Sequence, residues 1–317
     1  MKRFPKLASI VALFVIGWIA TPANAQGYKT WIASTGSDAN NCSRSAPCAT
    51  LTGAYAKTSA GGEIICADSV AFSYISIEKS LTINCEGTAG VNTAANNTQT
   101  VGSMTISTNS GDTIVLRGID IDGQNRSNGI EFLGAGTLII EHSRIANGYN
   151  GIIFRPNASS KLVVANNLIT TSGSGTTGAG ILVAPSYNAS AQIMIDHAVI
   201  ASNVFGIAID GSQSTAGINA TISDSVLASN KNDGVVATTS PGHAPIGLMV
   251  KNTKSTNNGY GIRSIGPNVT VRVDGSTIIG NGTGVSALSG GSLLTLHTNV
   301  VHANGTDGSF TGSLSLQ

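Results

Sequence analysis

The sequence contains few charged and few aromatic residues. Asp, Glu, Lys and Arg make up 10% of the 317 residues, and Phe, Trp and Tyr make up 5%. An ordinary globular domain carries about 25% charged residues. The formal net charge of +1, without a basic stripe, argues against a nucleic-acid partner and against tight electrostatic binding to anionic membranes. The scarcity of Glu and Lys also disfavours a helical fold, because helices favour these residues.

Long apolar runs are missing beyond the N-terminus. Lys2, Arg3 and Lys6 precede an apolar run at 7–20, and a small-x-small site follows at 23–25. This pattern predicts a signal peptide over residues 1–25, followed by export to the periplasm or the outside of the cell. An uncleaved anchor is the alternative, but spanning a membrane takes about 20 apolar residues. Removal of the three basic residues changes the formal charge from +1 to −2.

Cysteine is scarce and is confined to the first third of the mature chain. The four residues are Cys42, Cys48, Cys66 and Cys85. A structural zinc site is disfavoured, because this region has neither a CxxC motif nor a histidine. An even number behind a signal peptide predicts disulfides, for which three connectivities exist. We favour Cys42–Cys48 with Cys66–Cys85, since each pair closes a short loop, and the other pairings stay open.

Glycine, by contrast, is abundant and recurs with a period. A glycine precedes a short apolar run eight times, and an asparagine often lies three or four residues upstream of that glycine. The eight glycines are Gly129, Gly151, Gly180, Gly206, Gly234, Gly261, Gly284 and Gly308. The spacings lie between 22 and 29 residues. A period of this length indicates stacked supersecondary units rather than one globular core.

Each unit also contains a stretch in which apolar residues alternate with polar ones. Examples are LVVANNLI from Leu162 and IMIDHAVI from Ile193. Alternation with period two is typical of a strand with one buried face. A turn residue such as His142, Asn166 or His197 follows, and then a second apolar pair. Because the strands of one unit cannot pair with each other, they must pair with the equivalent strands of the neighbouring units.

These patterns predict an all-β chain, a right-handed parallel β-helix. A leucine-rich repeat is the second choice, but no helical period separates the strands. A β-sandwich would show hairpin turns and no fixed register. The alignment predicts outward columns, in which Arg117 neighbours Glu141 and Lys251 neighbours Asp274 as exposed ion pairs. It places Leu294 and Leu296 inward and His297 outward in the last unit.

Residues 26–95 do not repeat, and we expect them to form an N-terminal cap with the first coils, before the β-helix repeats of residues 96–317. TLTGAYAKTSAGG from Thr50 predicts a short helix that ends at Gly61-Gly62. A cap would cover the open core of a solenoid, and the disulfides would staple it. The C-terminus lacks a capping helix, so we expect the last coil to be covered by self-association or by a partner.

The segment TWIASTGSDANNCSRSAPCATLTGAYAK, from Thr30, resembles the opening of exported bacterial right-handed β-helix proteins of the pectate-lyase-like superfamily. The resemblance, cap plus coils, covers nearly the whole mature chain. It implies the β-helix fold. It implies no single activity, because that superfamily includes lyases, hydrolases, epimerases and proteins without a known reaction.

Catalytic candidates come from one strand. Asp120 and Asp122 are two residues apart, so both can face the same side about 7 Å apart. That separation fits the two carboxylates of an inverting hydrolase, and Arg117 lies close in sequence. The alternative is that Asp122-Gly123 forms an ordinary turn. The paired aspartates and the RIK-type motif of polygalacturonases, which the resemblance would bring, are not present.

Carbohydrate-binding candidates are Tyr149, Phe205 and Tyr260, which precede the recurring glycines by one or two residues. Aromatic rings at one edge of the coils could stack on the apolar faces of sugars, although turn packing is the simpler interpretation. Arg155-Pro156 resembles the Arg-x-Pro neighbourhood of pectate lyases, but the acidic cluster of their calcium sites is missing. We therefore predict no cofactor and no metal site, with calcium, which no clear acidic cluster supports, as the alternative.

Two functions remain open. We favour an exported carbohydrate-associated or surface-interaction module that does not catalyse a reaction, with a polysaccharide or a cell-surface glycan as its partner. The alternative is a polysaccharide lyase or glycoside hydrolase acting in the groove of the β-helix. No nucleic-acid partner and, after signal cleavage, no membrane insertion are expected.

Overall fold

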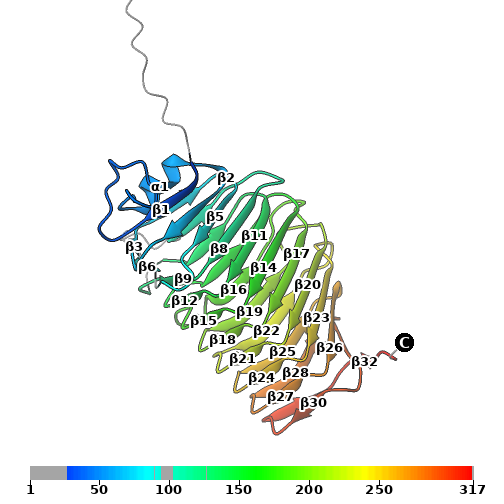
Figure 1. The fold of residues 1–317 in the computed structure, drawn as a ribbon. Coiled ribbons are helices and arrows are strands. Elements are labelled where there is room, and N and C mark those ends of the chain that lie inside the picture. Colours follow the sequence, from blue (N-terminus) through cyan, green and yellow to red (C-terminus); the bar gives the residue numbers. More distant parts are fainter. Residues whose placement is uncertain (1–26, 89, 94–102, 126, 316–317) are drawn as a thin grey trace, which may run out of the picture.

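The structure is a computed structural model that describes residues 27–88, 90–93, 103–125 and 127–315. The predicted signal peptide lies outside the described residues. A stack of coils forms an elongated body with the cap at its N-terminal end (Figure 1). Within the described residues, no helix has the length and apolar character needed to cross a membrane.

Three parallel sheets run along the stack, and each complete coil contributes one strand to each sheet. Sheet 1 contains β1 (Gly27–Ile32), β2 (Thr58–Cys66), β5 (Leu81–Asn84), β8 (Thr113–Arg117), β11 (Gly136–Glu141), β14 (Ser160–Ala165), β17 (Ala191–Asp196), β20 (Ile218–Ser223), β23 (Ile246–Lys251), β26 (Val269–Asp274), β29 (Ser292–Thr295) and β32 (Gly312–Ser313). Sheet 2 contains β3 (Ala71–Phe72), β6 (Gly90–Thr93), β9 (Ile119–Asp122), β12 (Arg144–Ala146), β15 (Leu168–Thr170), β18 (Val199–Ala201), β21 (Val226–Ala228), β24 (Lys254–Thr256), β27 (Thr277–Ile279) and β30 (Val300–His302). Sheet 3 contains β4 (Ile75–Ile77), β7 (Met104–Ile106), β10 (Ile130–Phe132), β13 (Ile152–Phe154), β16 (Ala179–Val183), β19 (Phe205–Asp210), β22 (Asp233–Thr238), β25 (Tyr260–Ile265), β28 (Thr283–Leu288) and β31 (Thr306–Gly308).

The predicted parallel β-helix and its inward columns are confirmed. Leu162 pairs with Leu138 below and Ile193 above, and all three side chains are buried in the core. The turn between sheets 1 and 2 is a single left-handed residue, with φ of 49° at His142 and 48° at His197. These residues are therefore turn residues, as the alternation predicts.

The recurring glycines form a column at the start of the sheet 3 strands. A Cβ atom on Gly206 would lie 2.4 Å from the carbonyl oxygen of Gly234, and one on Gly234 would lie 2.7 Å from that of Gly261. Only glycine allows the coils to approach this closely. The period noticed in the sequence is therefore a steric requirement of the stack.

Buried asparagines form a ladder along the turn that leads into sheet 3. The backbone N–H and the side-chain amide of Asn230 both donate to Oδ1 of Asn258, each at 2.9 Å. Asn258 makes the same two bonds to Asn281, also at 2.9 Å. Each asparagine thus satisfies polar groups of the preceding coil that are shielded from water.

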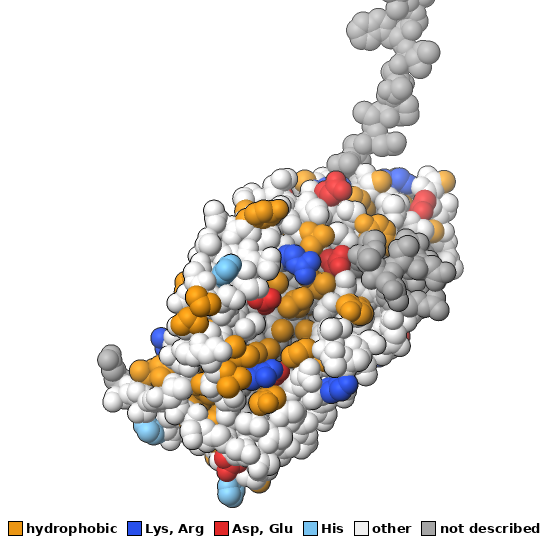
Figure 2. Space-filling view, turned by 180° about the vertical axis from the view of Figure 1, so that it is seen from behind, with side chains coloured by type: hydrophobic (Ala, Val, Ile, Leu, Met, Phe, Trp, Pro, Cys, Tyr) orange, Lys and Arg blue, Asp and Glu red, His pale blue; other side chains and the backbone are white. Residues whose placement is uncertain are grey.

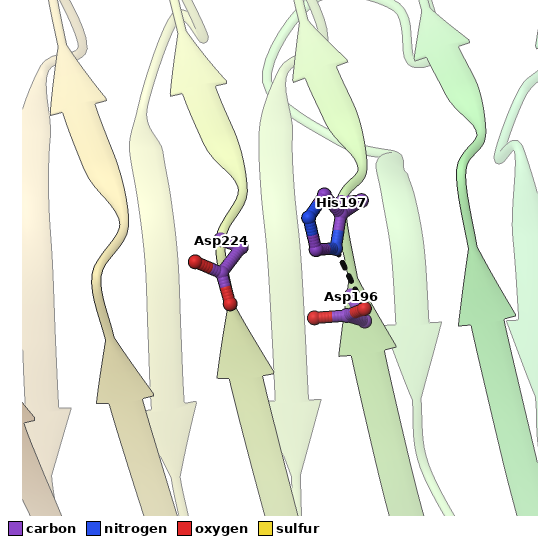
Figure 3. A group of neighbouring side chains, drawn as sticks. All are labelled: Asp196, His197 and Asp224. Carbon is purple, nitrogen blue, oxygen red and sulfur yellow. Dashed lines mark hydrogen bonds and ion pairs between the residues drawn. The ribbon is translucent and has the colours of Figure 1, made fainter.

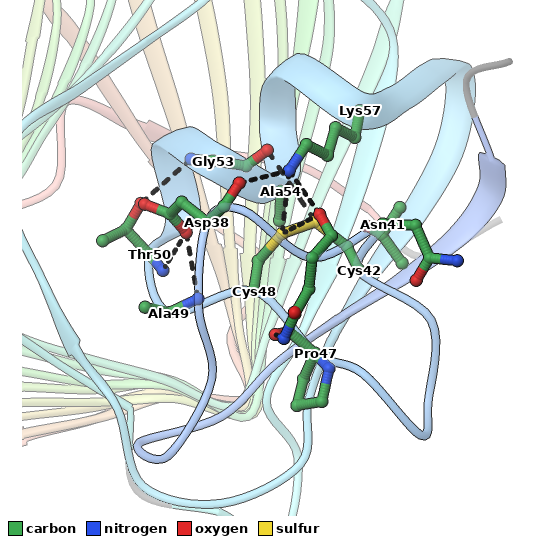
Figure 4. The surroundings of a disulfide bond; sticks show 12 residues. Asp38, Asn41, Cys42, Pro47, Cys48, Ala49, Thr50, Gly53, Ala54 and Lys57 are labelled. Carbon is green, nitrogen blue, oxygen red and sulfur yellow. Dashed lines mark hydrogen bonds between the residues drawn. A yellow bond between two sulfur atoms is a disulfide. The ribbon is translucent and has the colours of Figure 1, made fainter. Parts of the chain in front are cut away.

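The cap contains helix α1 (Leu51–Lys57) and is stapled by the disulfides Cys42–Cys48 and Cys66–Cys85, the pairing that we favoured. Figure 4 shows Lys57 and Asp38 beside the first bridge. The Thr50 side chain caps the helix by accepting from the Gly53 N–H at 2.9 Å.

The predicted end of this helix at Gly61-Gly62 is wrong. The helix ends at Lys57, and the extended residue Thr58 begins β2, where it pairs with Gly27. A Cβ atom on Gly62 would lie 2.6 Å from the carbonyl oxygen of Tyr28. Gly62 therefore lets two strands approach each other rather than ending a helix.

The predicted register of the last coil is wrong by one residue. Leu293, not Leu294, pairs with Val271 and is fully buried. His297 accordingly adopts the left-handed turn conformation, with φ of 67°. Gly308 pairs with Val285 and so lies outside the glycine column. Two adjacent leucines fit either register, and the short turn before β29 selects the earlier one.

Of the two predicted ion pairs, one forms. The Arg117 NH2 donates to Glu141 Oε2 at 2.7 Å. Lys251 and Asp274 are neighbours in the ladder, but no ion pair joins them in the described structure, where Asp274 Oδ1 accepts from the Thr298 hydroxyl. Exposed pairs of this kind contribute under about 1 kcal/mol each.

Candidate functional site

The outer face of sheet 3 carries a groove with a volume of about 350 Å³. The strands β16, β19, β22 and β25 form its floor, and the loop before β16 forms one wall. The groove is lined by Asn150, Thr176, Thr177, Gly178, Ala179, Leu182, Phe205, Ala208, Asp210, Val236, Thr238, Arg263 and Ile265. Apolar side chains gather along the middle of the molecular face seen in Figure 2, with few charges among them.

The floor follows from the ladder register. Leu182, Ala208, Val236 and Arg263 occupy equivalent outward positions on four successive strands. The small side chain of Ala208 leaves a hollow between its larger neighbours. The result is a shallow apolar channel with polar groups at its edges, as in many ligand sites.

Of the predicted aromatic residues, Phe205 lines this groove, and Tyr260 lies beside it, against the lining residue Arg263. Phe205 and Tyr260 are the first residues of β19 and β25, and both are half-buried. They belong to one column, two coils apart, which corresponds to about 10 Å at the usual strand spacing. Asp233 occupies the position between them, since it pairs with Tyr260 in the ladder.

Asp233 is fully buried and forms an ion pair with Arg263, which is 19% exposed. Burial raises the pKa of Asp233 to about 6, although the Arg263 charge and its hydrogen bond act in the opposite direction. The Arg263 guanidinium lies 4.3 Å from the centroid of the Tyr260 ring. Within the described chain, Asp233 Oδ1 and Arg263 Nε have no hydrogen-bond partner. A perturbed, incompletely satisfied buried pair beside a groove is typical of functional sites.

The predicted catalytic residues lie elsewhere. Asp120 and Asp122 share the outward face of β9 in sheet 2, as predicted. Asp120 accepts from Arg144 at 2.8 Å, and Asp122 Oδ1 accepts from the backbone N–H of Gln124 at 2.9 Å. Arg117 is in sheet 1, where it pairs with Glu141 instead of with either aspartate.

The other two predicted carbohydrate-binding residues lie outside the groove. Tyr149 is 42% exposed, and its hydroxyl lies 3.0 Å from that of Thr177, which is part of the groove wall. Arg155 follows β13 and is exposed, while its backbone N–H donates to the carbonyl of Phe132. Neither is among the residues that line the channel.

Asp196, His197 and Asp224 bring three potential metal ligands within 4.8 Å of one another at the turn after sheet 1 (Figure 3). Both carboxylate oxygens of Asp196 are already engaged, one by the Ser223 hydroxyl at 2.6 Å and one by His197 Nδ1 at 2.7 Å. The Ser223 bond and the His197 bond hold the pKa of Asp196 below its usual value, and the bond to Asp196 raises the pKa of His197. The cluster thus forms an exposed hydrogen-bond network between two coils.

A second groove, of about 380 Å³, lies on the outer face of sheet 1. Met194 and Met249 line its middle, with Lys161 and Arg272 as its charged residues. Among its described lining residues there is neither an aromatic ring nor a carboxylate. This second groove therefore has no counterpart of the buried ion pair or of the aromatic side chains found at the sheet 3 groove.

Residues 81–248 match the family described as the right handed beta helix region. The chain belongs to this right-handed β-helix family. No curated protein shows significant similarity to the sequence.

Several solved structures share the fold of this β-helix protein. A double mutant of the periplasmic alginate epimerase AlgG superposes with a TM-score of 0.52 at 15% identity, covering 81% of this chain and 76% of the epimerase chain. The pectate lyase Pel9A superposes at 0.53 with 12% identity, covering 86% and 72%. A complex of XylC with xylose superposes at 0.55 with 11% identity, covering 82% and 69%. At these identities the likeness shows the fold alone.

Sequence reasoning missed Asp233 and Arg263 in this β-helix protein. A signal for both was present, because Asp233 directly precedes the recurring Gly234 and Arg263 follows Gly261 by two residues. The spacing of these glycines also defines the sheet 3 register, which places Asp233 between Phe205 and Tyr260. The column of turn residues after sheet 1, which contains His197 and Asp224, likewise indicates that Asp196 and Asp224 lie on neighbouring coils.

Proposed function

We propose that this β-helix protein binds a polysaccharide in the groove on the outer face of sheet 3. The observation that carries the proposal is the column in which Phe205 and Tyr260 lie two coils apart beside an apolar floor. Pyranose rings have apolar faces that pack against aromatic rings, and their hydroxyls need polar partners. Thr176, Thr177 and Asp210 supply such partners at the edges of the channel.

The solved structures of the same fold support a carbohydrate ligand. Two of them are named as a pectate lyase and an alginate epimerase, and a third contains xylose. An open channel that runs across successive coils also suits an extended chain better than a compact small molecule. We favour binding without cleavage, because Asp210 is the one carboxylate that lines the groove in the described structure.

We further propose that the protein acts outside the cytoplasm, in the periplasm or in the extracellular space. Its two disulfides fit an oxidising compartment. The signal peptide predicted for residues 1–25 agrees with this location. A cell-surface or matrix polysaccharide would be the ligand available there.

Calorimetric titration with a panel of neutral and acidic oligosaccharides tests the binding proposal. We expect Phe205→Ala and Tyr260→Ala each to weaken binding at least about tenfold, because each removes a stacking surface. The matched control is Tyr187→Ala, since Tyr187 is 79% exposed and does not line the groove. Binding that is insensitive to both Phe205→Ala and Tyr260→Ala, or a complete lack of binding across the panel, would contradict the proposal.

Catalysis is the second candidate function, as a lyase or glycoside hydrolase that uses Asp120 and Asp122, with Arg117 nearby in sequence. One observation favours it, namely that both carboxylates face outward from β9 two residues apart, which in a strand corresponds to about 7 Å, within the range of inverting hydrolases. Incubation with the same panel, with and without calcium, would be followed by new reducing ends and by the absorbance of unsaturated products. Turnover that is lost in Asp122→Asn would support this candidate, and no turnover would leave the binding function alone.

A further inference from the structure

The charges around the sheet 3 groove point to the class of saccharide that it takes. Among the described residues that line the groove, Asp210 and Arg263 are the charged ones. Arg263 is paired with the buried Asp233 directly beneath the channel. The three charges add up to −1 when all are ionised, so the groove offers no net positive charge to an anionic ligand.

We propose that the groove is selective for neutral saccharides and that Asp233 sets this selectivity by cancelling the charge of Arg263. The inference rests on the proposed carbohydrate-binding function and deepens it. Asp233 is a positioning residue here, because it acts through Arg263 and is itself shielded from the channel.

The geometry keeps the two charges together. Arg263 projects outward from β25 and lies over the Tyr260 ring at 4.3 Å, while its NH2 group donates to Asp233 Oδ2. Its Nε atom is buried, and Oδ1 of Asp233 is also buried. If Arg263 left Asp233 to bind the carboxylate of a ligand, the buried Asp233 charge would lose its partner, which is energetically costly.

A uronic acid in the channel would therefore meet the Asp210 carboxylate and a guanidinium whose charge the buried Asp233 already neutralises. Like charges brought together in a partly desolvated site disfavour the wrong ligand, which is a common origin of specificity. A neutral sugar meets no such repulsion. Its hydroxyls can bond to the exposed part of Arg263 and to the side chains of Thr176 and Thr177.

The test compares neutral and uronate oligosaccharides of equal length in calorimetric titrations at neutral pH. It uses a Lys161→Gln/Arg272→Gln background, so that the basic residues of the sheet 1 groove do not contribute to anion binding. We expect the background protein to bind the neutral ligand at least about tenfold more tightly. Asp233→Asn should leave the charge of Arg263 uncompensated. We expect it to lower the ratio of neutral to uronate affinity by at least about tenfold and to make uronate binding sensitive to salt.

Asp224→Asn is the matched control, because it makes the same change of charge at an exposed turn outside the groove. A preference of the background protein for uronates, or a ratio unchanged by Asp233→Asn, would overturn the inference while leaving carbohydrate binding intact. Failure to bind either ligand class would instead count against the proposed function.

A pH arm keeps the inference testable if Asp233→Asn does not fold. The titratable and charged groups beside Asp233 are Arg263, which pairs with it, and Tyr260, its neighbour in the ladder, and among the described residues that line the groove there is no histidine. Protonation of Asp233, whose pKa burial raises to about 6, should shift the background protein toward uronate binding at acidic pH. A neutral-to-uronate ratio that stays constant across that range would overturn the inference.

Discussion

Asp233 is a carboxylate whose burial outweighs its ion pair. It is fully buried, and its pKa lies at about 6 despite the adjacent guanidinium of Arg263. An ionised carboxylate with one unsatisfied oxygen is costly in such surroundings, even when it is paired. Retention of this residue next to a groove is easier to explain by ligand selection than by stability.

The stability of the protein should reveal this cost through its pH dependence. Because the folded-state pKa of Asp233 lies above the usual 3.8, the folded protein binds the proton more tightly than the unfolded chain. The corresponding stability is present below about pH 4 and is lost as the pH rises toward 6. Asp233→Asn should therefore gain about 2–3 kcal/mol relative to wild type between pH 4 and pH 7, from two pKa units at about 1.4 kcal/mol each.

Denaturant unfolding at a series of pH values measures this difference. Asp224→Asn serves as the comparison, because it replaces an exposed carboxylate with the same amide. A difference curve for Asp233→Asn that is flat between pH 4 and pH 7 would show that Asp233 titrates normally in the folded protein.

At the scale of strands and turns, the sequence predicted the stack well where side chains alternate clearly. The sheet 1 column through Glu141, Asp196 and Lys251 follows from period-two alternation, and the ladder has this register. The left-handed turn residues could also be predicted, since His, Asn and Asp tolerate that conformation. Both signals are local, and a parallel solenoid makes local signals sufficient because every coil repeats the same pairing.

Signals that depend on contacts between distant residues could not be read in this way. The helix in the cap ends at Lys57 because Thr58 pairs with Gly27, a partner 31 residues away. The adjacent leucines 293 and 294 satisfy either register of the last coil. The Asp233–Arg263 pair joins two coils through residues 30 positions apart in the sequence.

The asparagine ladder should be the most sensitive turn element. Asn258 accepts from both donors of Asn230, and its own amide donates to the carbonyl of Leu227 at 3.0 Å. Asn258→Ala would leave buried donors of Asn230 without an acceptor, at a cost of about 2–4 kcal/mol. Asn219→Ala, on the exposed outer face of sheet 1, should change stability by less than about 0.5 kcal/mol.

Chemical unfolding measures the two substitutions, and hydrogen exchange at the Asn230 amide locates the effect. Protection at that amide should fall in Asn258→Ala and stay unchanged in Asn219→Ala. Equal loss of stability in both variants would mean that the ladder adds nothing beyond ordinary asparagine contacts.

At the scale of the whole molecule, the stack is a one-dimensional array in which each coil contacts only its neighbours. Every strand of sheet 1 between β8 and β29 pairs with the strand of the preceding and of the following coil. The stability of such an array is approximately a sum over coils and their interfaces. A complete coil should therefore be removable, provided that the ladder register is kept.

Deletion of residues 194–220 removes one coil and joins Ile193 to Thr221. Since Ile193 pairs with Ala220 in the native ladder, the join keeps Ile193 and Ile222 on the inward face of a hybrid strand. We expect a folded, shorter β-helix with an unchanged far-UV strand signal and a lower thermal midpoint. Deletion of residues 194–219 leaves one residue more and turns Ile222 outward, so it should unfold or become sensitive to protease, because a one-residue slip exchanges the two faces of a strand. Circular dichroism and limited proteolysis compare the pair, and equal behaviour of the two deletions would contradict a core built from stacked, in-register columns.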